Sequence, residues 1–242
     1  MTAKLRLLGA AFLAALTLPL GQAAAQEKDF IFYGVSFEQF EFREGIDDSG
    51  EVLAWDGDAF IGNDEWKLRL VSEGEYETDE EVFETLEHQL VVQRLATDFF
   101  DVKAGVRYDA PVGPNRFYGV VGLHGLAQQW FEIDADLFLS EKGDLSARLD
   151  ADYELLITNR WILTPSAEID FAFSDDKAIG VEAGFVSAEV GLRLSYDLLD
   201  RAISPYVGVH YERLLGESAD LARDDGEAVD GLFLVAGLKI LF

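Results

Sequence analysis

The chain has 242 residues, of which 46 are acidic and 19 basic, so its formal net charge is −27. So acidic a chain does not bind nucleic acid by releasing counterions from phosphates, and this class of function is excluded. The sequence has no cysteine, which excludes thiolate metal sites and disulfide bridges.

The first 25 residues have the pattern of a secretory signal peptide. Lys4 and Arg6 precede an apolar run at 7–20, and three alanines at 23–25 supply a small-residue cleavage site. The apolar run is shorter than the roughly 20 residues that a membrane-spanning helix needs. We therefore expect residues 1–25 to be removed and residues 26–242 to form a single domain. No other uncharged run is long enough for a spanning helix, so a membrane location requires a β-barrel.

The remaining sequence reads as about twelve strands with turn-rich segments between them. The predicted strands cover 30–43, 52–61, 66–76, 82–95, 99–109, 117–126, the two arms of a hairpin at 130–156, 161–171, 185–196, 205–214 and 232–242. An even number of strands is typical of a single-chain bacterial barrel.

The hairpin at 130–156 shows most clearly which face of the predicted sheet is apolar and which is charged. Apolar residues occupy every second position, and the residues between them are nearly all charged. A period of two places the two sets on opposite faces of a strand pair. Because one face is apolar and the other charged, we predict an all-β, transmembrane, antiparallel up-and-down β-barrel with its apolar side in outer-membrane lipid. A sandwich that buries its apolar faces between two sheets is the alternative fold.

The connections and the aromatic residues favour the barrel. Short turns near Gly62, Thr97, Gln128, Asn159 and Asp200 alternate with mostly longer loops near Asp47, Gly113, Asp176 and 217–231. Such asymmetry is typical of outer-membrane barrels, whose short turns are periplasmic. Aromatic residues gather near predicted strand ends, where rings lie at the lipid headgroups. The terminal Phe242 resembles the signal that outer-membrane assembly reads.

Charged residues of the inward face are the candidate metal ligands. The predicted lumen-facing set also contains Glu73, Asp101, Asp109, Asp152, Glu154, Asp170 and Glu189, with Lys103, Arg107, Arg148 and Arg193 among them. The residues selected as candidate ligands are Glu132, Asp134, Asp136, Asp150, Glu168, His210 and Glu212. Carboxylates with an imidazole suit Cu(II), although oxygen ligands also suit Ca²⁺ and Mg²⁺. The alternative is that these charges pair with one another across the lumen.

The three histidines differ in predicted orientation. His210 alternates with apolar neighbours and precedes Glu212 by two residues, so it faces inward and is the best single candidate ligand. His124 is also predicted to face inward. His88 shares the apolar register of its strand and is predicted to face outward.

Several segments resemble the copper resistance protein B family of outer-membrane proteins. They include AGVRYD at 104–109, the stretch 122–170, EVGLRLSYDL at 189–198 and SPYVGVHYER at 204–213, and FEQFEFR, WDGDAFIG and SEGE upstream. The resemblance covers nearly all of 30–242. It implies a small barrel that acts in copper tolerance or copper passage, with copper ions bound transiently and a periplasmic multicopper oxidase as partner. We expect a monomer with no tightly bound cofactor.

The sequence departs from the family pattern in one respect. Members commonly carry a Met- and His-rich segment between the signal peptide and the barrel, and this sequence shows none there. Only residues 26–29 separate the predicted cleavage site from the first strand, and Met1 is the sole methionine. Any copper function is therefore expected to rest on the barrel itself.

Two other functions stay open at this point. The acidic lumen could form a passive, cation-preferring pore without copper specificity, because its field concentrates any cation. A lipid hydrolase would need a nucleophile and a base on the lipid face, for which His88 with Ser72 or Thr85 is the available set, and no motif surrounds them. We therefore expect no enzymatic activity.

Overall fold

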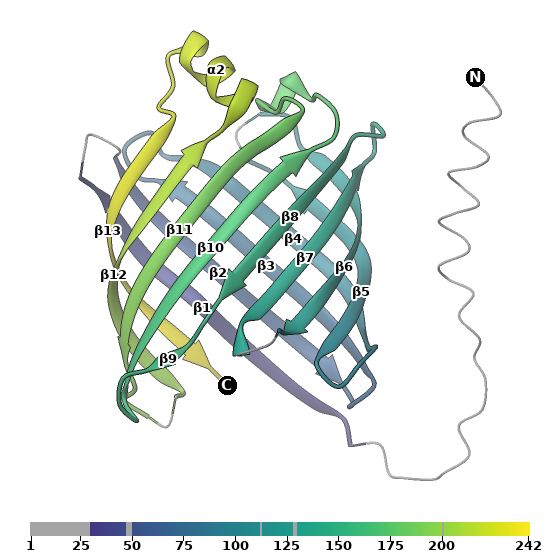
Figure 1. The fold of residues 1–242 in the computed structure, drawn as a ribbon, viewed down its shortest axis with the longest axis vertical. Coiled ribbons are helices and arrows are strands. Elements are labelled where there is room, and N and C mark those ends of the chain that lie inside the picture. The colour runs from purple at the N-terminus through teal and green to yellow at the C-terminus, as the bar shows by residue number, and fades with distance from the viewer. Residues whose placement is uncertain (1–29, 47–49, 112, 128–129, 200) are drawn as a thin grey trace, which may run out of the picture. The chain divides into compact units, whose positions relative to one another are not determined.

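The computed structural model describes residues 30–46, 50–111, 113–127, 130–199 and 201–242. The predicted signal peptide and its cleavage site lie outside the described residues and stay predictions. Residues 31–242 form one compact unit, a barrel of antiparallel strands (Figure 1). Its elements are β1 (Phe32–Gly45), β2 (Glu51–Gly62), β3 (Trp66–Glu77), β4 (Val82–Leu95), β5 (Phe100–Asp109), β6 (Arg116–Leu126), β7 (Glu132–Ser140), β8 (Leu145–Asp152), β9 (Leu155–Leu156), β10 (Trp161–Ala172), η2 (Lys177–Ile179), β11 (Gly184–Tyr196), β12 (Ile203–Leu214), α2 (Gly216–Asp225) and β13 (Asp230–Leu241).

The barrel is closed and has twelve strand positions. Each strand pairs with its neighbours in sequence order, and β13 pairs with β1 to complete the ring. β8 and β9 together fill one position beside β10. The predicted fold class is therefore confirmed, and the predicted strand ends lie within two residues of the observed ones.

Proline explains why one strand position is divided. The register between β10 and its partner is continuous from Ser166 opposite Asp152 to Leu163 opposite Leu155. Between these pairs, the Tyr153 amide donates to the Pro165 carbonyl over 3.1 Å. Pro165 has no N–H to return the bond, so the ladder is interrupted without a change of register.

The side chains alternate as a membrane barrel requires. On the outer face, Leu70 is 52% exposed and Val207 is 60% exposed. On the inner face, Glu41 and Glu87 are each 1% exposed. Because apolar side chains point out of the closed sheet and charged ones into the lumen, the sandwich alternative is wrong.

The lumen also holds apolar side chains that the sequence pattern did not assign. Val91, Val120 and Phe138 form one buried cluster beside Tyr118. The Arg107 guanidinium lies 4.5 Å from the centroid of the Phe138 ring. A cation over an aromatic face is stabilising, so this apolar cluster shares the inner wall with charge.

The segment predicted as a loop at 217–231 contains a helix, α2, which corrects that prediction. Ala219 and Ala222, three residues apart on one face, are buried, and the helix ends at Gly226 in the left-handed region with φ of 84°. The Ser218 hydroxyl accepts a hydrogen bond from the Glu182 amide over 3.0 Å. The helix is therefore tied to the β10–β11 connection through Ser218, a contact that local sequence does not reveal.

The two ends of the barrel differ. One end carries the short connections that precede β3, β5, β7, β10 and β12, and we call it the turn end. The opposite end carries the β10–β11 and β12–β13 connections, and we call it the loop end. In outer-membrane barrels, the short turns are periplasmic and the longer loops extracellular. Within the described part of the chain, no helix combines the length and the apolar character needed to cross a membrane.

Candidate functional site

A cavity of about 240 Å³ lies inside the barrel, and its wall is mostly ionisable side chains. The wall includes the inward carboxylates of Asp134, Asp150, Glu168 and Glu189, together with His210. These residues come from five different strands, because a period of two turns every second side chain of each strand inward. The cavity is thus the place where the predicted ligands can meet a cation.

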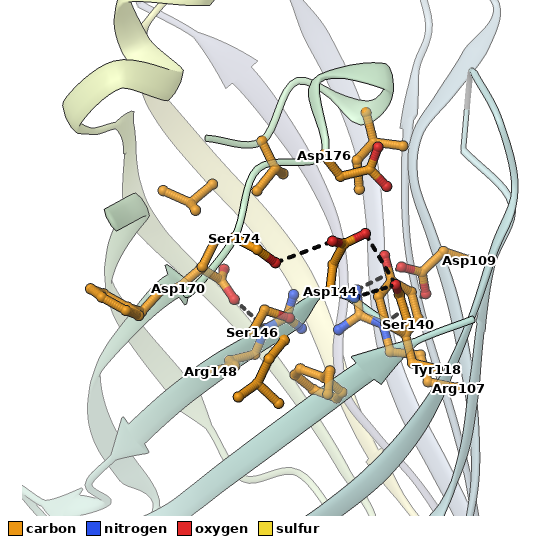
Figure 2. Close-up of a pocket in the computed structure, with 17 residues that line it drawn as sticks. Arg107, Asp109, Tyr118, Ser140, Asp144, Ser146, Arg148, Asp170, Ser174 and Asp176 are labelled. Carbon is orange, nitrogen blue, oxygen red and sulfur yellow. Dashed lines mark hydrogen bonds and ion pairs between the residues drawn. The ribbon is translucent and has the colours of Figure 1, made fainter. Parts of the chain in front are cut away.

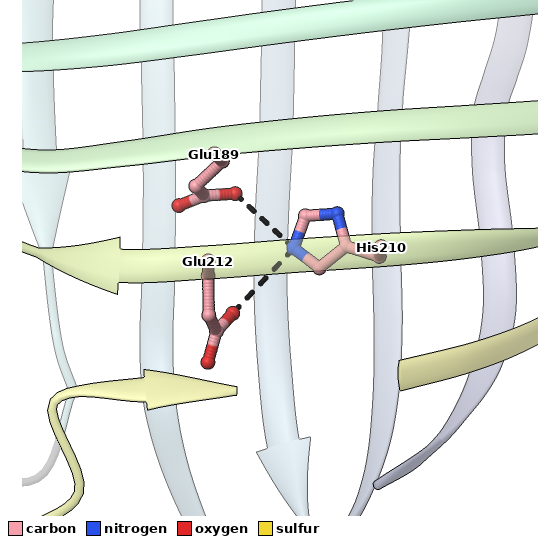
Figure 3. Close-up of side chains that lie close together, drawn as sticks. All are labelled: Glu189, His210 and Glu212. Carbon is pink, nitrogen blue, oxygen red and sulfur yellow. Dashed lines mark ion pairs between the residues drawn. The ribbon is translucent and has the colours of Figure 1, made fainter. Parts of the chain in front are cut away.

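Three side chains on two neighbouring strands form the most compact group (Figure 3). Glu189 on β11 lies opposite Glu212 on β12, and His210 precedes Glu212 by two residues and so shares its face. The His210 Nε2 atom lies 3.5 Å from a carboxylate oxygen of Glu189 and 3.5 Å from one of Glu212. One candidate ligand atom from each side chain lies within 4.8 Å of the other two. Atoms at such separations can bind a single ion.

His210 is buried without a hydrogen bond. It is 4% exposed, and neither ring nitrogen has a hydrogen-bond partner in the described structure. Nearly all buried polar groups in proteins are satisfied, so an imidazole with two unused nitrogens requires an explanation. A cation bound between the ring and the two carboxylates would supply the missing partner.

The surroundings of His210 are fixed by a buried carboxylate, Glu41. Arg193 donates to both Glu41 oxygens over 2.8 and 2.7 Å, Arg43 donates over 2.7 Å, and the Tyr206 hydroxyl donates over 2.7 Å. Arg43 and Arg193 line the same cavity as His210. Because Glu41 holds both guanidinium groups, their charge next to His210 is partly offset.

The predicted ligands do not form one site. His210 and Glu212 come together, and their third partner is Glu189, which was predicted to face the lumen but was not selected as a ligand. Glu189 lies opposite Glu212 because of the register in which β11 and β12 pair. No local signal in the sequence could therefore have selected Glu189 as a ligand.

A second group of predicted ligands surrounds His124 near the turn end. The His124 Nδ1 atom lies 2.6 Å from an Asp134 oxygen, and Nε2 lies 3.8 Å from a Glu132 oxygen. Lys103 forms ion pairs with Asp134 and with Asp136, the latter over 2.9 Å. His124 therefore already has a carboxylate partner, and Asp136 is neutralised by a lysine.

The last two predicted ligands lie on neighbouring strands. Glu168 pairs with the Arg148 guanidinium over 3.0 Å. Asp150 lies opposite both Asp134 and Glu168, and no lysine or arginine of the described chain lies within ion-pair distance of it. Charge pairing therefore accounts for Asp134, Asp136 and Glu168, whereas Asp150, His210 and Glu212 stay candidate ligands.

Arg148 joins distant parts of the wall. From β8 it reaches Glu73 on β3 over 3.1 Å and Glu87 on β4 over 3.4 Å, and it also contacts Asp170 on β10 over 3.1 Å. Its side chain lines both the 240 Å³ cavity and a second cavity of about 200 Å³ (Figure 2). The guanidinium therefore bridges the lumen between the two cavities.

The second cavity lies at the loop end and is covered by the β10–β11 connection. Asp176 in this connection accepts two hydrogen bonds from Arg116 on β6, over 2.7 and 3.1 Å. The hydrogen bonds from Arg116 lower the pKa of Asp176. Ser174 in the same connection donates to Asp144 over 3.2 Å. These contacts tie the connection to a wall three strand positions away.

The outward face contains the residues that a lipid hydrolase would need, but not their hydrogen bond. His88 is exposed and lies directly opposite Ser72 on the neighbouring strand. The Ser72 hydroxyl instead accepts a hydrogen bond from the Trp55 indole over 3.1 Å. A nucleophile needs its base within hydrogen-bond reach, and no such bond joins these two residues in the described structure.

Comparison with known proteins agrees with this architecture. A family model described as "Copper resistance protein B precursor (CopB)" matches residues 31–242. A copper resistance protein B homolog from Pseudomonas syringae pv. tomato is 37% identical over 205 residues, covering 85% of this chain and 68% of the relative. Copper resistance protein B from Escherichia coli is 35% identical over 221 residues, covering 91% and 73%.

Among solved structures, the chain is similar to outer-membrane barrels. The NanC porin has a TM-score of 0.49 at 14% identity, covering 86% of this chain and 99% of its own. A protein solved in work on the in-meso crystallization of membrane proteins has a TM-score of 0.50 at 9% identity, covering 87% and 83%. The family match together with the closed barrel identifies an outer-membrane location. The chain therefore belongs to the copper resistance protein B family of outer-membrane proteins.

Proposed function

We propose that this barrel acts in copper resistance by binding copper ions reversibly in its lumen, at Glu189, His210 and Glu212. The observation that carries the proposal is the buried His210 ring, whose two nitrogens have no hydrogen-bond partner and whose Nε2 faces two carboxylates. The family membership supports copper as the ion, and the geometry supports these three side chains as its ligands.

The chemistry of the three side chains fits Cu(II). Imidazole nitrogen and carboxylate oxygen are both good ligands for Cu(II), and nitrogen-containing sites bind it more tightly than other divalent first-row metals. The three side chains provide one imidazole nitrogen and two carboxyl groups. We treat copper as a cargo ion that enters and leaves, because three side chains on a water-accessible wall leave coordination positions for water.

Metal titration with matched histidine variants tests the proposal. The refolded barrel should bind Cu(II), and its electron paramagnetic resonance spectrum should show coupling to a ring nitrogen. His210→Gln should lose that coupling and most of the affinity, whereas the outward control His88→Gln should keep both. If His210→Gln binds Cu(II) with unchanged affinity and coupling, the site is wrong.

The competing function is a passive, cation-preferring pore. The acidic wall would concentrate Ca²⁺ and Zn²⁺ as well as copper, since a field does not select among divalent ions. Calorimetry with Cu(II), Zn²⁺ and Ca²⁺ separates the two functions. Equal, weak binding of all three ions favours the pore, and preferential Cu(II) binding favours copper homeostasis.

Growth under copper stress connects binding to resistance. Cells that lack the gene should regain tolerance when they express the native chain but not when they express His210→Gln at equal outer-membrane level. The periplasmic multicopper oxidase implied by the resemblance stays a predicted partner, and co-purification with the barrel would test it.

A further inference from the structure

The strand register aligns ionisable side chains into a row that crosses seven strand positions. Each pairing places an inward residue of one strand opposite an inward residue of the next, from β5 to β12. The row, here called the acidic row, consists of Asp101, His124, Asp134, Asp150, Glu168, Glu189 and Glu212. Side chains directly opposite each other in antiparallel sheets have Cβ atoms about 5 Å apart, so each member is adjacent to the next.

The acidic row runs from one end of the barrel toward the other. Asp101 is the second residue of β5, directly after a turn-end connection. Glu212 is the third residue from the end of β12, next to the loop end. Strands in a barrel are tilted and staggered, so a row that follows the hydrogen bonds winds along the wall and changes height. The acidic row is therefore a spiral path between the two ends.

Positive partners are unevenly distributed along the acidic row. Asp101 pairs with Lys67 over 3.3 Å, Asp134 pairs with Lys103, and Glu168 pairs with Arg148 over 3.0 Å. For the remaining acids, Asp150, Glu189 and Glu212, the described chain provides no lysine or arginine within 4 Å. Carboxylates directly opposite one another destabilise a sheet, so these unpaired positions are places where a bound cation would be stabilising.

Two further observations point to a cation. The 240 Å³ cavity is lined by the four consecutive carboxylates from Asp134 to Glu189, so this part of the row borders continuous open space. The cavity also reaches His210, which is 4% exposed and whose two ring nitrogens have no hydrogen-bond partner in the described structure, next to the last two acids of the row. The row thus leads to the His210 imidazole, which is available as a metal ligand.

We propose that the acidic row is the path along which a divalent cation moves between the turn end and the Glu189, His210 and Glu212 group, with Asp150 as an intermediate binding position. The inference rests on the proposed copper function for its cargo. An ion would pass between neighbouring carboxylates by exchanging one oxygen ligand for the next, without any covalent step. Asp150 is suited to this role because its neighbours in the row, Asp134 and Glu168, already have basic partners.

Cu(II) entry into liposomes tests the path. The barrel is reconstituted in vesicles that contain a dye quenched by Cu(II), and Asp150→Asn is compared with Asp56→Asn. Asp56 on β2 lines the same cavity but lies outside the acidic row, so its variant makes the same Asp-to-Asn change in the same space. Asp150→Asn should slow entry about tenfold, in line with the effect of a charged wall on ion entry, whereas Asp56→Asn should stay close to native.

Further variants and a second measurement keep the outcome decisive. Asp150→Glu should restore entry, and Asp150→Ser replaces Asp150→Asn should that variant fail to fold. Equal slowing by Asp150→Asn and Asp56→Asn, or unchanged entry in Asp150→Asn, would overturn the path. The nitrogen coupling at His210 is recorded in the same preparations and should persist in Asp150→Asn. If the native barrel shows no nitrogen coupling, the copper site alone is refuted. Comparing Mn²⁺ entry through the native barrel and the same variants would then still test the path.

Discussion

Replacing Glu41 by glutamine should strongly destabilise the barrel. The Glu41 carboxylate is 1% exposed and accepts hydrogen bonds from two arginines and one tyrosine. A glutamine side chain at this position would have nearly the same shape but no charge. Arg43 would keep its ion pair with Glu75 at 2.5 Å, whereas Arg193 would lose its only carboxylate partner in the described structure.

The expected loss in the free energy of unfolding follows from the burial of the Glu41 carboxylate. Removing one partner of a buried ion pair costs about 3–5 kcal/mol, because the remaining charge is left uncompensated away from water. Tyr206→Phe removes a single hydrogen bond to the charged oxygen and should cost about 1.5–3 kcal/mol. At an m value of about 2 kcal/mol per molar urea, Glu41→Gln should lower the unfolding midpoint by roughly 2 M.

Urea unfolding of the barrel in lipid vesicles, followed by tryptophan fluorescence, measures these differences. Glu38→Gln is the control, since Glu38 lies on the same strand but its side chain is 48% exposed and has one ion pair with Lys239. Loss of the Glu38–Lys239 ion pair should lower the free energy of unfolding by no more than about 1 kcal/mol. A Glu41→Gln barrel as stable as the Glu38→Gln barrel would refute the assignment of Glu41 as the main electrostatic anchor of the lumen.

Three other perturbations give separate tests. Arg148→Met removes the bridge between the two cavities and should raise single-channel conductance in planar bilayers; an unchanged conductance would show that Arg148 does not restrict the lumen. Asp176 has a lowered pKa in the folded chain, so its contribution to stability is full above the unfolded value of 3.8 and is lost as the pH falls through the folded value. The protection of the amides of the β10–β11 connection, measured against the intrinsic exchange rate at each pH, should therefore fall below about pH 4. Asp176→Asn should lack this protection already at neutral pH, and equal protection in the native and Asp176→Asn chains would mean that Arg116 does not hold this connection. Gly74→Val should destabilise the barrel by about 1–3 kcal/mol in the urea assay, because a Cβ atom at Gly74 would overlap the Trp55 ring, and a neutral effect would mean that the indole moves freely.

The sequence by itself determined the strands and their sidedness. In the hairpin at 130–156, apolar and charged residues alternate, and this period of two distinguishes the two faces of a strand wherever it lies. The strand predicted at 161–171 is confirmed although it contains a proline, because Pro165 interrupts the hydrogen-bond ladder but leaves the alternation of the side chains intact. The inward orientation of His210 followed from the same alternation.

Tertiary structure alone decided which inward residues meet. Glu189 joins His210 because β11 and β12 pair in one particular register, and a shift of that register would give the histidine other partners. Arg148 reaches Glu73 across 75 residues of sequence because the closed ring brings β8 and β3 to face each other over the lumen. The periodicity of a single strand contains neither its register nor its partners across the barrel, so the acidic row emerges only when neighbouring strands pair in their particular registers.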